Sequence, residues 1–271
     1  MDAVHESDVP ACIDRQTGAL YNSFGMSPQP ITVQLFATCL IEALRPEAGI
    51  AVVQVLERLG VAVEYPDGQT CCGQPAFNAG AWDDARAMAR HTLAVLARSD
   101  APIVVPSGSC ADMIVHHYPE ILAGDPKYGP LAQAVAARTY EFTQFVVEQL
   151  GVTDLGARFQ GKVAYHPSCH LLRGLGVTEA PRRLLAHVHD AEVIDLPGAE
   201  ECCGFGGLFA VKMSDISGAM LQRKLDAIER AGAQIVAGCD VSCLLHIGGG
   251  LHRRGAPVDT RHLAELLAHQ G

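Results

Sequence analysis

Eight of the ten cysteines in this 271-residue chain fall into two sets with nearly equal internal spacing. The first set is Cys39, Cys71, Cys72 and Cys110, and the second set is Cys169, Cys202, Cys203 and Cys243. Equivalent members lie 130, 131, 131 and 133 residues apart, and only Cys12 and Cys239 fall outside the pattern. Thiols that repeat in this way, in a chain with no export signal, indicate a metal or redox site.

The spacing narrows the chemistry open to these thiols. A single cysteine is usually a small buried hydrophobic residue, but a repeated pattern argues against that explanation here. Cys71 and Cys72 are adjacent, so their Cα atoms lie about 3.8 Å apart, less than the roughly 4.4–6.8 Å that a disulfide spans. Four thiolates can hold either zinc or an iron–sulfur cluster. Zinc sites usually use paired C-x2-4-C segments, so an adjacent pair with two distant cysteines favours iron–sulfur and leaves zinc as the alternative.

The segments around the cysteines repeat as well, which indicates a duplicated unit. Each set begins with an apolar run that ends in a lone cysteine (ITVQLFATC, then KVAYHPSC) and continues through Cys-Cys-Gly. Short β-branched runs alternate with stretches of helical periodicity. The predicted strands are Ile31–Phe36, Val61–Val63, Ile103–Val105, Val163–Tyr165, Val193–Leu196 and Ile235–Ala237. The predicted helices are Ala48–Leu59, Trp82–Ala97, Ala180–His187, Ser217–Ala231 and Leu263–Ala268, with a connector helix over 130–150.

This alternation predicts an α/β fold of two duplicated Rossmann-like β-α-β units, with parallel sheets related by a pseudo-twofold axis. Loops beyond the carboxyl ends of parallel strands form a binding crevice, so each cysteine set should converge at one edge of its sheet. We expect a flexible extension over residues 1–30, which includes Cys12. The first repeat and connector helix should span 31–150, and the second repeat 151–271.

Composition excludes several functions. The 20 basic and 30 acidic residues give a formal charge of −10, and no basic stripe is present, which argues against a nucleic-acid partner. No apolar run reaches the roughly 20 residues of a membrane-spanning helix, and the acidic N-terminus is unlike a secretory signal. We therefore expect a cytoplasmic protein with no direct membrane insertion, which associates with a membrane only through partners.

The amino-acid sequence around the cysteines resembles that of the tandem cysteine-rich CCG-domain family. The segments that carry the resemblance are GQTCCGQPAFNAG, VPSGSCADMIVHHYPE, YHPSCHLLRGLGV, ECCGFGGLFAVK and SCLLHIGGGL, and it extends over residues 31 to about 269. The family includes heterodisulfide reductases of the B type, the glycolate oxidase iron–sulfur subunit and the lactate utilization proteins. The sequence around the cysteines is most similar to that of the lactate utilization proteins. The resemblance implies that each cysteine set holds an iron–sulfur cluster, with 4Fe-4S the expected type and one or two clusters in the chain.

It also implies an electron-transfer subunit of a complex that oxidises L-lactate to pyruvate, with the other subunits of a lactate utilization system as partners. Whether the isolated chain is itself an oxidoreductase stays open. One alternative is a reductase of the heterodisulfide type, directed at a thiol, a disulfide or a quinone. Another is a zinc-stabilised scaffold subunit.

The chain departs from the heterodisulfide branch at two positions. In the heterodisulfide reductase branch, a fifth cysteine lies three residues before the last cysteine of each set. This chain has Ser107 and Asp240 at those two positions. Each site is therefore expected to have four cysteine ligands or an added oxygen ligand, and Cys239 has no assigned role. The histidines His166, His170 and His246 are expected to be surface or capping residues, with hydrogen bonding to cluster sulfur as the alternative.

Overall fold

The computed structural model of the protein describes residues 31–270 and two short strands, β1 (Cys12–Ile13) and β2 (Leu20–Tyr21), which pair antiparallel. The rest of the extension predicted over residues 1–30 lies outside the described residues, so its predicted flexibility stays a prediction. Among the described helices, none combines the length and the apolar character needed to cross a membrane.

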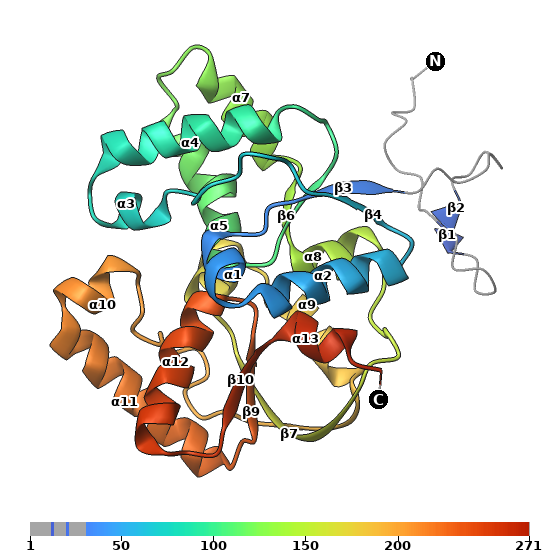
Figure 1. Ribbon diagram of the computed structural model, residues 1–271, viewed down its shortest axis with the longest axis vertical. Coiled ribbons are helices and arrows are strands. Elements are labelled where there is room, and N and C mark those ends of the chain that lie inside the picture. Colours follow the sequence, from blue (N-terminus) through green and yellow to red (C-terminus); the bar gives the residue numbers. More distant parts are fainter. Residues whose placement is uncertain (1–11, 14–19, 22–30, 271) are drawn as a thin grey trace, which may run out of the picture.

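Two four-stranded parallel sheets form the centre of the molecule (Figure 1). The first contains β3 (Thr32–Leu35), β4 (Ala62–Glu64), β5 (Ile103–Val105) and β6 (Thr139–Glu141), in the order β4-β3-β5-β6. The second contains β7 (Arg158–His166), β8 (His189–Ile194), β9 (Ile235–Gly238) and β10 (Asp259–His262), in the order β8-β7-β9-β10. Numbered within each unit, both orders are 2-1-3-4, which confirms the predicted pair of α/β units.

Helices connect the parallel strands and cover the sheets, as parallel pairing requires. In the first unit they are α1 (Cys39–Leu44), α2 (Pro46–Arg58), α3 (Gln74–Asn78), α4 (Trp82–Leu96), α5 (Gly108–Asp112), η1 (Met113–His117), α6 (Tyr118–Ile121), α7 (Tyr128–Ala136), α8 (Phe142–Gln144) and η2 (Phe145–Gln149). In the second they are η3 (His170–Gly174), α9 (Glu179–Ala186), α10 (Leu208–Lys212), α11 (Ser214–Ala231), α12 (Val241–Arg254) and α13 (Leu263–Ala268). The segments η1, η2 and η3 are π-helical turns, which are uncommon and often lie near functional sites.

Helix α2 shows how the sequence specifies these elements. Pro46 occupies the first turn, where its missing N–H is harmless. Val52, Val55 and Leu56 follow at helical spacing and are fully buried. In the last turn, Arg58 donates a hydrogen bond to the carbonyl of Ala268 at 3.1 Å, so the helix is tied to the C-terminal end of the second unit.

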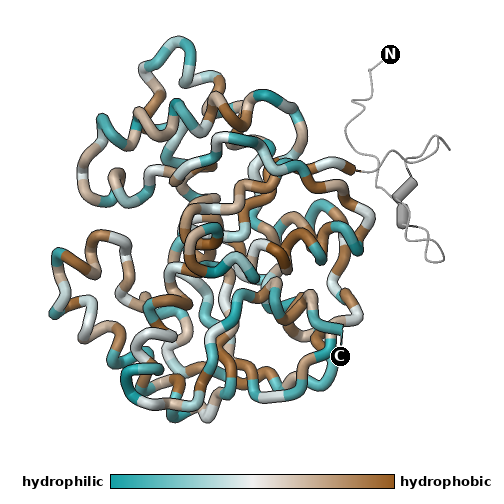
Figure 2. Tube along the Cα trace, in the orientation of Figure 1, coloured by the Kyte–Doolittle hydropathy of each residue, from teal (hydrophilic) through white to brown (hydrophobic). Residues whose placement is uncertain are grey.

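The two units share a large hydrophobic core and a small cluster of Ile41, Ala48 and Val241. Residues of α2 and η2 from the first unit pack with α9, α13 and strand β7 from the second. Two smaller cores lie on the outer faces, one behind α4, η1 and α7 and one behind α11 and α12. Figure 2 shows apolar chain concentrated between the units, with hydrophilic chain on the surrounding loops. The outer cores belong to single units, whereas the central core joins them.

The predicted connector helix over 130–150 is wrong. The chain forms α7, then the edge strand β6, and then the short α8 and η2. The break follows from the side chain of Glu141, which ends the strand and accepts hydrogen bonds from the N–H groups of Thr143 and Gln144 at the start of α8. Strand β10 was not predicted either, and its polar sequence DTRH explains why.

Candidate metal centres

The first cysteine set lies where the order of strands reverses in the first sheet. Cys39 begins α1 just after β3, and Cys110 lies in α5 just after β5, and these two strands are neighbours. Cys71 and Cys72 come from the loop between β4 and α3. Such a reversal leaves a crevice beyond the carboxyl ends of the strands. All four cysteines line one cavity there.

The sulfur atoms of the first set are in mutual contact. The Sγ atoms of Cys72 and Cys110 are 3.3 Å apart. Hydrogen bonds from Cys39 and Cys72 lower the pKa of Cys71 to about 3. The contact with Cys71 and burial raise the pKa of Cys39, and the contacts with Cys110 and Cys71, together with burial, raise the pKa of Cys72. One thiolate is therefore stabilised at the centre of the set, with neighbouring thiols as its donors.

The second set repeats this arrangement. Cys169 follows β7 and Cys243 lies in α12 after β9, while Cys202 and Cys203 occupy the loop before α10. Hydrogen bonds from Cys169 and Cys203 lower the pKa of Cys202 to about 2, and the N–H of Gly204 donates to its sulfur at 3.4 Å. Cys243 accepts a hydrogen bond from Cys203, which lowers its pKa to about 6. The four cysteines line a second, smaller cavity.

A glycine follows each cysteine pair for a steric reason. Gly73 and Gly204 both have positive φ, 87° and 91°, which L side chains rarely adopt. A Cβ on Gly204 would lie 2.7 Å from the carbonyl oxygen of Ser217 in α11, and one on Gly73 would lie 3.2 Å from Cβ of Met88 in α4. In the structure they let the loop approach the helix behind it.

The two cavities share one wall. Its residues come from both units and line both cavities: Gln74, Asn78, Ser109, Phe205, Gly207, Asp240 and Ser242. The cysteine sets of the two units therefore face one another across a thin layer of protein.

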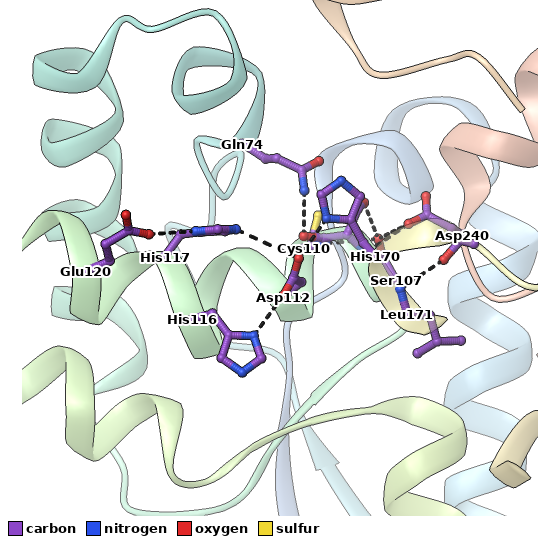
Figure 3. Close-up of polar contacts among 12 residues, drawn as sticks. Gln74, Ser107, Cys110, Asp112, His116, His117, Glu120, His170, Leu171 and Asp240 are labelled. Atoms are coloured by element: carbon purple, nitrogen blue, oxygen red, sulfur yellow. Dashed lines mark hydrogen bonds and ion pairs between the residues drawn. The ribbon is translucent and has the colours of Figure 1, made fainter. Parts of the chain in front are cut away.

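Asp240 joins the two units within this wall, and its side chain is buried. Its Oδ1 accepts from the N–H of Ser242 at 3.1 Å, which caps α12. Its Oδ2 accepts from the N–H of Ser109 at 2.9 Å and from the hydroxyl of Ser107 at 3.3 Å, which lie at the start of α5 (Figure 3). The residues that replace the fifth cysteines thus hold together the two helix starts that carry Cys110 and Cys243.

A second polar contact joins the units beside Asp240. Asp112 accepts hydrogen bonds from Nδ1 of His170 at 2.7 Å and Nδ1 of His116 at 2.8 Å (Figure 3). Burial raises the pKa of Asp112, but these hydrogen bonds outweigh burial and the net shift is downward. The contact with Asp112 raises the pKa of His170. Sequence reasoning missed Asp112, because nothing in its local pattern marks it.

The remaining sequence candidates fall in different places. Cys239 is buried in the central core with its sulfur 3.9 Å from the hydroxyl of Tyr165, and it joins neither set. His246 lies half-buried against Phe205, with ring centroids 5.8 Å apart. His166 is 1% exposed, which corrects the expectation of a surface or capping histidine. Its ring lies against Cys203 and Cys243, and the three ligand-capable atoms all lie within 4.8 Å of one another.

Both sites have the donors of a thiolate-bound metal cluster. Each offers four sulfur atoms from three separate segments around one cavity. Such donors suit metals that accept thiolates, including zinc and the iron of iron–sulfur clusters. The adjacent cysteine pairs are free thiols in the structure. That the eight cysteines act as ligands stays a prediction.

Sequence comparison defines the class of protein. The chain matches the cysteine-rich CCG domain over residues 33–115 and again over 163–248, one match per unit. The chain belongs to this family of cysteine-rich CCG-domain proteins.

Named relatives narrow the comparison. The chain is 46% identical over 236 residues to Lactate utilization protein A of Exiguobacterium sp., which covers 87% of this chain and 96% of that protein. It is 48% identical over 235 residues to Lactate utilization protein A of Bacillus pumilus, which covers 87% and 98% of the two chains. An aspartate racemase homologue from Pyrococcus horikoshii OT3 shows 12% identity and a TM-score of 0.30 over 89% of this chain and 96% of that one, a likeness too low to support an inference.

Proposed function

We propose that this protein is the iron–sulfur electron-transfer subunit of a system that oxidises L-lactate to pyruvate. The observation that carries the proposal is the pair of four-cysteine sets on opposite sides of one shared wall. The extended identity to proteins named for lactate utilization supports the substrate. A bound cluster at either set would supply one-electron transfer without proton or atom transfer.

The residues of the chain would hold and insulate these centres. The first set would hold one cluster and the second set another, with 4Fe-4S as the proposed type. Asp240 and the serines around it would fix the spacing of the two sites, and Phe205 would line both of them. Neither cavity contains a glycine-rich phosphate loop of the G-x-G-x-x-G type, so we place the lactate-oxidising group on a partner protein. The location that we propose is the cytoplasm, with membrane contact only through partners.

The metal content tests this proposal directly. Protein purified anaerobically from iron-replete cells should be brown, with acid-labile sulfide close to iron in amount and broad thiolate-to-iron absorption. Exposure to air should bleach it, because Cys39, Cys71, Cys169 and Cys202 are only partly buried. A colourless preparation with stoichiometric zinc and no sulfide would refute the redox function and favour the scaffold alternative.

Partner assembly tests the second half of the proposal. Co-expression with the other proteins of the lactate utilization system should give a heteromer on gel filtration that oxidises lactate. Turnover by this chain alone on a disulfide or quinone, with no gain from partners, would instead support the reductase alternative.

A further inference from the structure

Thr38, the residue before the first cysteine of the first set, has a strained backbone. Its φ is 68° and its ψ is 143°, a conformation that L side chains rarely adopt and that is least favourable for a β-branched residue. Among the described residues, one other non-glycine residue has positive φ, the exposed Asp190, and aspartate tolerates such a conformation better. Thr38 is buried and lines the first cavity. The strain is therefore located at the first cysteine set.

Contacts on both sides hold Thr38 in this conformation. The N–H of Ala37 donates to Oε1 of Gln69 at 3.1 Å, and the carbonyl of Thr38 accepts from the N–H of Glu42 at 3.0 Å in the first turn of α1. The side chain of Thr38 makes no capping hydrogen bond. Strained residues persist where their surroundings fix them, and they are common at sites that change conformation. A displacement of the start of α1, which carries Cys39, would release the strain.

The second set has a relaxed residue at the equivalent position, Ser168. The φ of Ser168 is not positive, and its hydroxyl accepts from the N–H of Leu171 at 3.4 Å, which caps the following turn. Leu171 is fully buried in the central core. Nδ1 of His170 donates to Asp112 of the first unit at 2.7 Å. Cys169 therefore belongs to a segment that is capped, packed and tied to the other unit.

Helix α1 is less firmly held at its cysteine end. Its one buried residue is Ile41, which packs in the small cluster shared by the two units, and the other residues of the helix are half-buried or exposed. The far end is fixed, because Nη2 of Arg45 donates to the carbonyl of Thr260 at 2.9 Å. Motion of α1 should therefore be largest at Cys39.

The first cavity also leaves more space beside its cysteines. Its volume is about 130 Å³, against about 50 Å³ for the second cavity. Cys39 and Cys169 are both half-buried, so exposure does not distinguish them. The two sets differ instead in backbone strain, in the anchoring of the first cysteine and in free space.

We infer that Cys39 is the detachable ligand of the first set and that α1 is the gate through which metal enters and leaves that set. This inference rests on the proposed function, in which the cysteines are ligands. When Cys39 detaches, its bond to the metal breaks, the electron pair stays on the sulfur, and the thiolate takes a proton from water. Thr38 relaxes in the same step, so its strain lowers the cost of opening. The second set lacks this release and keeps its metal longer.

The test measures alkylation of Cys39 and Cys169 by iodoacetamide in the anaerobically purified, iron-loaded full chain, with peptide mass spectrometry to assign each site. A metal-bound thiolate is protected, so the rate follows the population of the open form when opening is fast. Cys39 should react roughly tenfold faster than Cys169, or more. Excess chelator should remove iron in two phases. A variant with Cys71 and Cys72 replaced by serine keeps only the second set intact and should show the slow phase alone.

Matched variants separate strain from other effects of substitution. Thr38→Gly should slow alkylation of Cys39 about tenfold, because glycine adopts positive φ freely. Tenfold corresponds to about 1.4 kcal/mol, within the roughly 1–3 kcal/mol that such a residue costs. Thr38→Val keeps the β-branched shape and should react at the wild-type rate. Ser168→Gly controls for the flexibility that glycine adds to a chain and should not slow alkylation of Cys169.

Two results would overturn the inference. One is equal alkylation of Cys39 and Cys169 in the wild-type protein, which needs no variant. The other is a Thr38→Gly protein that keeps its fold by circular dichroism and reacts at Cys39 as fast as wild type or faster. A wild-type protein without iron and sulfide would refute the proposed function itself, so metal analysis separates that failure from failure of the gate.

Discussion

Replacing Asp240 by alanine should weaken both metal centres and the joint between the units. The carboxylate is buried and accepts from the N–H groups of Ser242 and Ser109, one in each unit. Loss of the helix cap costs about 1 kcal/mol. Loss of a charged acceptor for a buried N–H costs about 1.5–3 kcal/mol. The free energy of unfolding should therefore fall by about 3 kcal/mol, which corresponds to roughly 6–12 °C in Tm for a chain of this size.

Urea denaturation of the metal-free protein, followed by circular dichroism, measures this change. Asp240→Asn keeps one acceptor oxygen and should lose about half as much stability. Ser107→Ala removes only weaker contacts and should cost about 1 kcal/mol. After reconstitution, iron should be lost from both sets, because Ser109 and Ser242 immediately precede Cys110 and Cys243. An alanine variant within about 0.5 kcal/mol of wild type, on the order of experimental error, would show that the carboxylate does not join the units.

Three further predictions concern single sites. Replacing Cys71 and Cys72 together by serine should remove about half of the bound iron, and loss of all iron would show one site shared by both units. Burial raises the pKa of Glu141 to about 7 from 4.5, so the folded state binds the proton more tightly and stability should fall by about 3 kcal/mol as pH rises from 4.5 to 7. Glu141→Gln should remove this slope in urea titrations at several pH values, and an unchanged slope would assign it to other groups. Gly108→Ala places a Cβ 2.6 Å from a side chain of η3 and should destabilise the protein, whereas Gly249→Ala, with open space around it, should be neutral or stabilising in thermal melts.

The repeated cysteines made much of the site predictable from sequence. Their positions after apolar runs, combined with the crevice rule for parallel sheets, correctly predicted that Cys39 and Cys110 meet beyond neighbouring strands. The edge strands β6 and β10 were missed because TYE and DTRH carry no apolar run, and their pairing depends on the rest of the sheet. Strand β8 begins four residues before its predicted start, because most residues of HDAEVI are exposed and only its end looks like a strand.

Contacts between the two units could not be predicted from local sequence patterns. Asp240 and Ser109 are 131 residues apart, so neither position shows that one caps the other. The contact of Asp112 with His170 also joins residues that are far apart in the sequence, so neither position predicts it. By contrast, alignment of the two repeats shows that Phe36 and His166 occupy equivalent positions, three residues before the first cysteine of each set. Only the structure shows that the imidazole of His166 lies against Cys203 and Cys243.

The central core has a consequence for how the two repeats fold. Helix α2 of the first unit packs against α13, near the C-terminus, and η2 lies with α9 in the same apolar cluster. A fragment cut between residues 150 and 151 would leave Val52, Val55 and Leu56 of α2 open to water on the face that α13 covers. Burying such side chains is worth about 1.5–3 kcal/mol each, so neither half should be soluble alone, and mixing the separate halves should restore a folded pair. The chain therefore behaves as a covalently linked dimer of two similar protomers, in which the second half completes the first.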